Sequence, residues 1–197
     1  MPKTRMSAGK RRRNILDAAL KVIADSNYYE ATTAKIAAQA GITEPIIYLH
    51  FASKKELFLQ LLDDIRRFII SVFRSIAAEE ADPLLKLRKL ATAHYEFVIR
   101  HGELHKVLSM AVTVNDADVK KKLAHIFRDL RNFFRNQLKE ARDKNLLRPD
   151  ADEEAVALMM LGWIGLVGTA RLTNAEKSLT RNDFERFIST VERILKK

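Results

Sequence analysis

Residues 32–54 read TTAKIAAQAGITEPIIYLHFASK, and their pattern predicts two short helices joined by a tight turn. The first helix is expected from about Thr33 to Ala40, where a threonine hydroxyl at its start can accept a hydrogen bond from an unpaired amide. Gly41 follows at once, and the end of a helix favours a residue that tolerates a left-handed conformation. The second helix is expected from about Thr43, with a proline tolerated in its first turn.

The apolar residues of this stretch have the spacing of a helix-turn-helix, a motif whose second helix lies in the major groove of DNA. A small residue, Ala37, stands where the two helices must cross closely. Ser53 and Glu56 then form the pattern of a capping box, which predicts the start of a long third helix. The residues expected to face inward are Ile36, Ala40, Ile42 and Ile47.

The chain resembles the tetracycline-repressor (TetR) family of bacterial regulators in its DNA-binding domain. The resemblance covers about 45 of the 197 residues, and beyond them the chain matches the family in length and helicity alone. It implies a homodimeric, ligand-responsive transcriptional regulator, more often a repressor, and it leaves the effector unidentified. The residues that carry it are the apolar helix 15–23, the segment 32–37, Gly41-Ile42, the run 47–51, and Lys54 followed by Glu56-Leu57.

Composition and periodicity predict an all-α fold. Four prolines and six glycines in 197 residues favour long helices with few turns, and there is no strand pattern and no repeat. We expect about nine helices, with a helix-turn-helix head and basic arm in residues 1–53 and an effector-binding and dimerisation bundle in residues 54–197. The later helices are expected near residues 53–80, 83–100, 103–113, 116–144, 155–172 and 180–195, with a polar loop at 174–178.

The composition also bears on the compartment. Cysteine is absent, so no disulfide is expected, which suits a reducing cytosol. The longest apolar run, 155–170, is short of the roughly 20 residues that span a bilayer, and no signal-peptide pattern precedes the first helix. We therefore expect a cytoplasmic protein with no membrane partner.

Positive charge is concentrated at the N-terminus of a chain whose formal net charge is +10. Residues 1–13 contain six basic residues and no acid: Lys3, Arg5, Lys10, Arg11, Arg12 and Arg13. Such a block indicates a polyanionic partner. The alternative is a solvated basic tail, but directly before a helix-turn-helix we favour contact with DNA phosphates.

No pattern in the chain indicates an enzyme. There is no glycine-rich phosphate loop, no metal-ligand spacing and no ordered nucleophile–base pair, so neither a cofactor nor a metal is expected. The acidic pair Asp63-Asp64 has no second cluster beside it, and we expect it to face solvent. The alternatives are a helical enzyme or ligand carrier with an incidental basic head, and a nonspecific DNA-coating protein.

The resemblance and the position of the short second helix predict the DNA contacts. Thr33, Tyr48, His50 and Lys54 suit phosphates, whereas the residues at the start of the helix can meet base edges. Glu44 is the awkward member, because phosphates repel a carboxylate; it either accepts from a cytosine amino group or pairs with a neighbour. The complete set is Thr33, Thr43, Glu44, Pro45, Ile46, Tyr48, His50, Lys54, Lys10 and Arg11.

Two further surfaces follow from the resemblance. A dimer interface is expected on the last two helices, at Gly162, Gly165, Gly168, Phe184, Phe187, Ile188, Val191 and Leu195. An effector site is expected inside the bundle, at Phe73, His94, Tyr95, Met110, Phe127, Phe134, Met159 and Trp163. Each of these residues is equally compatible with core packing. As a set they are rich in aromatic and apolar groups, which predicts a small hydrophobic ligand, uncharged or weakly acidic.

Overall fold

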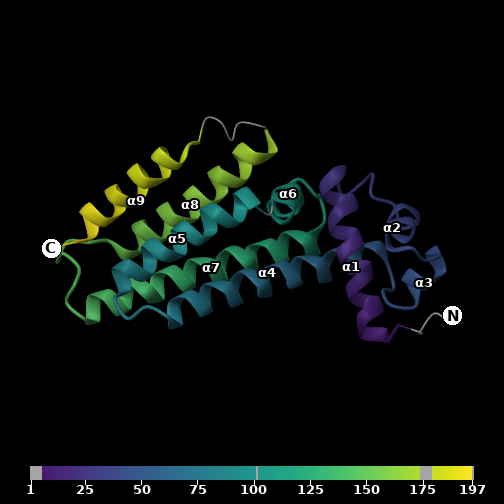
Figure 1. The fold of residues 1–197 in the computed structure, drawn as a ribbon, viewed down its shortest axis with the longest axis horizontal. Coiled ribbons are helices and arrows are strands. Elements are labelled where there is room, and N and C mark those ends of the chain that lie inside the picture. The colour runs from purple at the N-terminus through teal and green to yellow at the C-terminus, as the bar shows by residue number, and fades with distance from the viewer. Residues whose placement is uncertain (1–5, 101, 174–178, 197) are drawn as a thin grey trace.

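The computed structural model describes residues 6–100, 102–173 and 179–196, so Lys3, Arg5 and the expected loop at 174–178 lie outside it. Within these ranges the chain is all-α, with its helices running from a small head into an elongated body (Figure 1). Their bounds are α1 Ala8–Asp25, α2 Thr33–Ala40, α3 Glu44–Tyr48, α4 Lys54–Ala78, α5 Pro83–Arg100, α6 Gly102–Ala111, α7 Ala117–Asp143, α8 Glu153–Leu172 and α9 Arg181–Leu195.

Local capping interactions set the helix ends where the sequence predicts them. The Thr32 hydroxyl accepts a hydrogen bond from the Lys35 amide (3.2 Å), and Gly41 closes α2 in the left-handed conformation at φ 66°. Ser53 accepts from the Glu56 amide at the start of α4 (3.1 Å). The expected capping box differs in one detail, because the Glu56 carboxylate accepts from the Ala52 amide.

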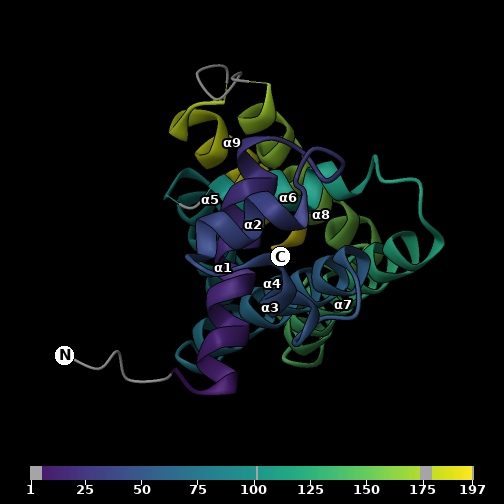
Figure 2. The same cartoon turned by 90° about the vertical axis from the view of Figure 1, so that its right-hand side faces the viewer.

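The head is a three-helix unit into which the long connector α4 is packed. Ile15, Ile36 and Ile47 contribute one fully buried side chain from each of α1, α2 and α3. The first turns of α4 add Leu57 and Phe58, which are buried in the same core. Figure 2 looks onto the head and shows α1 crossing in front of α4. The boundary at residue 53 stays a prediction, and α4 belongs to both parts.

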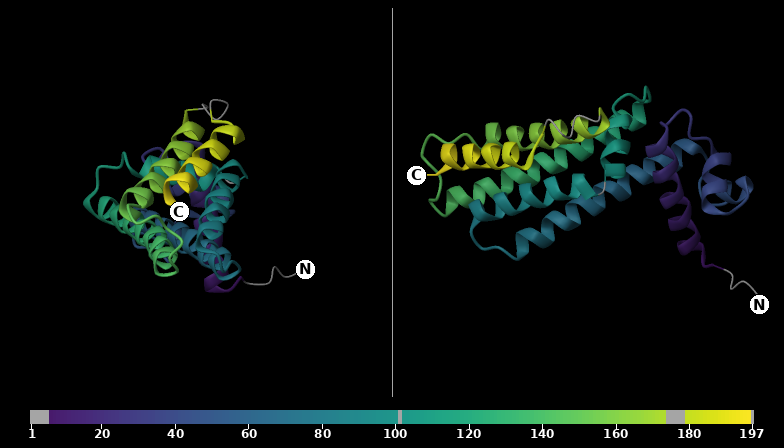
Figure 3. Two further views of the ribbon diagram at one scale, coloured as in Figure 1. Left: turned by 90° about the vertical axis from the view of Figure 1, so that its left-hand side faces the viewer. Right: turned by 45° about the horizontal axis from the view of Figure 1, so that its top comes forward.

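The body is a bundle in which α4 and α7 lie side by side, with α5, α8 and α9 stacked beyond them (Figure 3). Helix α8 is apolar over much of its surface, and its segment Glu153–Ala170 has the length and composition to cross a membrane, although 39% of it is buried within the protein. Helices in the core of globular proteins often have the same length and composition. Several of the apolar residues of α8 are buried in the body, and they account for part of its hydropathy.

The inward face of α9 corrects one expectation about the dimer. Phe184, Ile188, Val191 and Leu195 are each only 1% exposed and fill the core of their own subunit. They have no free surface with which to contact a second copy. Periodicity correctly identified this face as apolar, but periodicity does not say which surface covers it.

Candidate nucleic-acid interface and ligand cavity

Helix α3 presents one face to the head and the other to solvent. Ile47 is fully buried, whereas Thr43, Pro45 and Tyr48 are exposed, as a helix that enters a groove requires. Ile46 on the helix and His50 just after it are partly exposed. The sequence prediction omitted Leu49, which is 81% exposed and stands beside Tyr48 at the end of the helix. The sequence could have indicated this exposure, because a residue two positions after the inward-facing Ile47 points to the opposite side.

Glu44 is held by neighbours within the head. The Thr33 hydroxyl donates a hydrogen bond to the Glu44 carboxylate and also lies 3.2 Å from the Tyr48 hydroxyl. Thr33 itself is 8% exposed, so this cluster covers much of its surface. The carboxylate thus pairs with a neighbour, the second of the two roles expected for it, and it joins the start of α2 to α3.

The four basic residues at the start of α1, Lys10 to Arg13, have different surroundings. Arg12 faces the protein: it donates to the His50 carbonyl (2.6 Å) and to Gln60 Oε1 (3.2 Å), and its guanidinium lies 4.2 Å from the centre of the Phe51 ring. A cation at the end of a helix stabilises unpaired carbonyls there, so Arg12 holds the end of α3. Lys10 is exposed and Arg11 is partly exposed, so both side chains are available for phosphates, whereas the exposed Arg13 pairs with Asp64 (3.4 Å).

The Lys54 side chain contacts the turn between α1 and α2 within the head. Its ammonium donates to the Tyr29 carbonyl (3.2 Å) and lies 4.6 Å from the centre of the Tyr28 ring. Partial burial lowers the pKa of the Lys54 ammonium. Lys54 therefore fastens the start of α4 to the turn between α1 and α2.

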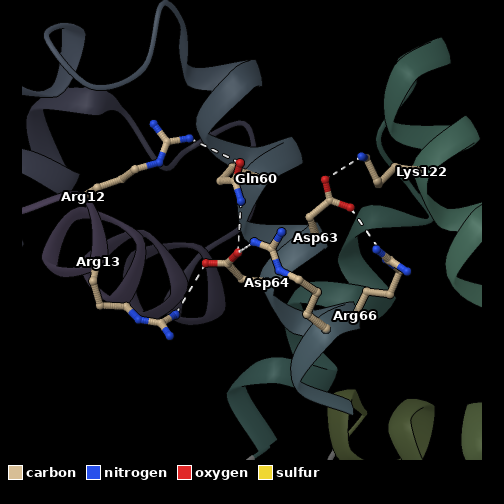
Figure 4. A network of polar contacts seen from close by, with 8 residues as sticks. Arg12, Arg13, Gln60, Asp63, Asp64, Arg66 and Lys122 are labelled. Atoms are coloured by element: carbon tan, nitrogen blue, oxygen red, sulfur yellow. Dashed lines mark hydrogen bonds and ion pairs between the residues drawn. The ribbon is translucent and has the colours of Figure 1, made fainter. Parts of the chain in front are cut away.

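The acidic pair Asp63-Asp64 joins the two parts of the protein, which corrects the expectation of a solvated face. Figure 4 shows Asp64 directed toward α1 and Asp63 directed toward α7. Asp64 pairs with Arg13 (3.4 Å), and Asp63 pairs with Lys122 (2.7 Å). Their side chains are 17% and 26% exposed. Adjacent residues on a helix point in directions about 100° apart, so one pair can contact both sides of the connector.

A cavity of about 370 Å³ lies inside the body, a volume typical of small-molecule sites. Its wall is mainly apolar and is formed by α4, α5, α6, α7, α8 and the loop between α6 and α7. A second groove, of about 550 Å³, lies between α1 and α4, and its lining combines apolar side chains with charged residues of both signs. The lining of the apolar cavity comprises Ile69, Phe73, His94, His105, Leu108, Ser109, Val112, Thr113, Leu123, Ile126, Phe127, Leu130, Ile164, Gly165, Gly168 and Thr169.

Three of the eight expected effector residues, Phe73, His94 and Phe127, lie in the cavity wall. The other five lie elsewhere. Tyr95 stacks on Phe184 (ring centres 5.0 Å apart) and Trp163 stacks on Phe187 (4.5 Å), so both belong to the contacts of α9. Phe134 is fully buried behind Phe73, Met159 is partly exposed on the outer side of α8, and Met110 is absent from the cavity wall.

His105 is the most informative residue that the sequence prediction missed. Its Nε2 lies 3.1 Å from Nε2 of His94, and both side chains are 4% exposed. Burial lowers the pKa of His105 to about 4, and burial followed by repulsion from His105 lowers the pKa of His94. The sequence places these residues 11 apart on two different helices, so no helical spacing could have joined them.

The loop between α6 and α7 contacts both the cavity and the head. Val112 and Thr113 are part of the cavity wall. Two residues further on, the Asn115 amide donates to the Tyr29 hydroxyl of the head (3.2 Å). Lys55 adds an ion pair with Asp118 (2.8 Å) at the start of α7. The loop and the start of α7 therefore connect the cavity wall to the head through a hydrogen bond and an ion pair.

The outer side of α8 carries an exposed apolar stripe, which we define as Ala155, Leu158, Met159, Gly162 and Leu166. Leu158 is 51% exposed and Leu166 is 49% exposed. A Cβ added to Gly162 or Gly165 would meet nothing within 4 Å, whereas one at Gly168 would lie 3.1 Å from Nδ1 of His105. The three glycines thus differ in their surroundings: Gly162 lies on the outer stripe, Gly165 lines the cavity, and Gly168 lines the cavity and packs closely against His105.

Known proteins resemble this chain in sequence and in fold. The model of "Bacterial regulatory proteins, tetR family" matches residues 15–61, which run from the middle of α1 to the first turns of α4. The chain is 30% identical over 140 residues to the nucleoid occlusion factor SlmA of Marinobacter nauticus, covering 71% of this chain and 72% of that protein. It is 24% identical over 163 residues to the fatty acid metabolism regulator protein of Bacillus subtilis, covering 83% of this chain and 84% of that one.

A solved structure extends the likeness to the whole fold. The regulator FadR of Bacillus subtilis in complex with stearoyl-CoA superposes with a TM-score of 0.77 at 23% identity, covering 92% of this chain and 96% of that chain. The match therefore includes the body as well as the helix-turn-helix. The chain belongs to the TetR family of bacterial regulatory proteins.

Proposed function

We propose that this protein is a cytoplasmic transcriptional regulator that binds a palindromic DNA operator as a homodimer and is released by a small hydrophobic effector. A repressor is favoured, in keeping with the family. The observation that carries the proposal is the pairing of an outward-facing recognition helix at one end of the molecule with an apolar cavity in the body. The connector α4 and the loop before α7 join these two parts.

The DNA surface consists of the exposed side of α3 and the basic start of α1. Thr43, Pro45 and Ile46 face outward at the start of the recognition helix, where base edges and thymine methyls can be reached. Tyr48 and His50 on this side of the head, and Lys10 and Arg11 at the start of α1, suit phosphates. Glu44, Thr33 and Lys54 support this surface through their contacts inside the head.

A second copy is proposed to cover the exposed stripe on α8. An apolar stripe of this kind on a monomer marks an interaction surface, because leaving it in water is unfavourable. The open Cβ position of Gly162 allows another backbone to approach closely, whereas Gly165 lies in the wall of the cavity. Phe187 is partly exposed at the edge of α9 and is proposed to contribute to the same face. A two-fold axis through this face would generate a symmetric dimer and hence a palindromic operator.

The effector is proposed to occupy the cavity of about 370 Å³. The wall contains Phe73, Phe127 and many aliphatic side chains, which favour an apolar ligand. The FadR structure contains stearoyl-CoA, and the apolar acyl chain of that molecule supports an effector with an apolar part for this chain as well. A ligand that favours one arrangement of the body over another would change the spacing of the two heads and weaken DNA binding.

Selection of DNA from a random library by the purified protein tests the proposal. The expected product is a palindrome whose half-sites lie about one helical turn apart, roughly 34–36 Å. Replacing Lys10 and Arg11 together by glutamine should weaken binding to this operator and to random DNA alike, and lower the slope of log affinity against log salt by about two. No enrichment over random DNA would overturn the proposal.

The hydrogen bond from Asn115 to Tyr29 should carry part of the effector response. Tyr29→Phe removes the hydroxyl but keeps the ring, so affinity for DNA alone and for ligand alone should change little. The factor by which ligand weakens DNA binding should fall by about fivefold, the value of one net hydrogen bond. Tyr28→Phe is the matched control, because the Tyr28 hydroxyl makes no hydrogen bond in the described part of the chain. If the ligand weakens DNA binding by the same factor in both variants, this hydrogen bond does not contribute to the effector response.

A further inference from the structure

The polar end of the cavity lies where α5, α6 and α8 meet. His94, His105 and Ser109 line it together with Gly168. The other two hydroxyls of the wall are already used within the protein, since Thr113 donates to the Met110 carbonyl (2.8 Å) and Thr169 to the Gly165 carbonyl (2.9 Å). Within the described residues the Ser109 hydroxyl has no such partner. This end of the cavity therefore offers hydrogen-bonding groups that the protein itself leaves open.

Hydrogen-bond counting assigns the tautomers of the histidine pair. Each neutral imidazole has one N–H and one bare nitrogen, so one Nε2 donates across the 3.1 Å contact and the other accepts. Nδ1 of His94 is buried without a partner. An orphaned buried N–H is rarer than an orphaned acceptor, which assigns the proton of His94 to Nε2. His105 then accepts at Nε2 and carries its own proton on Nδ1.

Gly168 leaves the Nδ1 edge of His105 uncovered. A Cβ on this residue would stand 3.1 Å from Nδ1 of His105 and 3.5 Å from Oγ of Ser109. Any other residue here would crowd the space beside these two atoms. The His105 N–H and the Ser109 oxygen therefore flank one small region, with a donor on one side and a hydroxyl that can accept on the other.

The same end of the cavity contains no charge that could neutralise an ion. Facing the histidine pair, α4 contributes Ile69 and Phe73, α7 contributes Leu123, Ile126, Phe127 and Leu130, and α8 contributes Ile164, two glycines and Thr169. The two histidines are the only titratable groups among the described residues of the wall. A charged head group would be buried here without a counter-ion, which is strongly unfavourable.

We propose that His105 and Ser109 bind the uncharged O–H head of an otherwise apolar effector, such as an alcohol or a carboxylic acid in its protonated form. The inference rests on the proposed function and names the chemical class of its ligand. The effector oxygen accepts from Nδ1–H of His105, and its proton is donated to Oγ of Ser109. His94 is a positioning residue, because its Nε2–H holds His105 in the tautomer that donates into the cavity.

Calorimetry with octanol and octyl methyl ether tests the role of the O–H group. The ether can accept from His105 but cannot donate to Ser109, so it should bind about tenfold more weakly than octanol. Ser109→Ala should weaken octanol by the same factor and leave the ether unchanged. Ser71→Ala, which removes a hydroxyl that donates to the Phe68 carbonyl on α4, should change neither. Equal binding of the two probes to the wild-type protein overturns the proposal.

Octanoic acid supplies an independent test. The acid is ionised at neutral pH and must take up one proton to enter as an uncharged molecule, so its affinity should fall about tenfold for each pH unit above neutrality. Octanol binding should show no such slope. Affinity for the acid that does not depend on pH would mean that the anion binds, which would overturn the proposal.

The same samples separate this inference from the proposed function. The selected operator is titrated in parallel with each probe. If the protein binds DNA sequence-specifically but shows no preference for the O–H probes, the proposed regulatory function is supported and the head-group proposal is wrong. Absence of sequence-specific DNA binding, with the octanol preference intact, would overturn the proposed function and leave the cavity chemistry standing.

Discussion

Replacing Leu166 by glutamate is expected to dissociate the dimer into monomers. Leu166 is 49% exposed on the outer stripe of α8, so the substitution should leave the fold of the subunit intact. In the proposed interface, however, the carboxylate would be buried without a partner, which is unfavourable by several kcal/mol. Analytical ultracentrifugation should show the change in mass. Because two linked heads bind far more tightly than one, operator affinity should fall at least about a hundredfold.

Two further glutamate variants act as controls for Leu166→Glu. Leu85 is 42% exposed in the first turn of α5, and Leu85→Glu should leave both the dimer and the operator affinity unchanged. Val191 is 1% exposed inside the subunit, so Val191→Glu should lower the free energy of unfolding rather than release folded monomers. A folded Leu166→Glu protein that remains a dimer would show that the interface lies on another surface.

The stability of the fold should fall as the pH drops below the ordinary pKa of histidine. In the unfolded chain His105 titrates near 6.5, whereas burial lowers its pKa to about 4 in the folded protein. Between these values the unfolded chain binds more protons, so protonation favours unfolding. The stabilisation is fully present above about pH 6.5 and is lost progressively toward pH 4, by about 3 kcal/mol in total.

Urea unfolding at a series of pH values measures this effect. His94 should act in the same direction, because its pKa is also lowered. The carboxylates with lowered pKa values, such as Glu140 and Glu192, contribute stability that is lost only at lower pH, since their ordinary pKa is near 4.5. The interval from about pH 6.5 down to about pH 5 therefore isolates the histidines. A double variant with phenylalanine at both positions should show a much flatter dependence, and an unchanged slope would assign the effect to other groups.

The sequence by itself determined the elements that depend on near neighbours along the chain. A threonine, Gly41 and Ser53 mark helix ends as the sequence predicts, because caps join residues only a few positions apart. The turn before α3 and the orientation of Ile47 follow from the same local rules and from helical periodicity. The all-α fold and the family could therefore be predicted from the order of the residues alone.

Only the tertiary structure decided which surface covers each apolar face and which distant groups meet. Periodicity made the inward side of α9 apolar, yet its residues pack into their own subunit while the outer stripe of α8 is exposed. Asp63 and Asp64 look like a solvated pair in the sequence, but residues on α1 and α7 convert them into contacts between head and body. The pairing of His94 with His105 requires the crossing of two helices, whose geometry is set by the packing of the whole bundle rather than by any local preference.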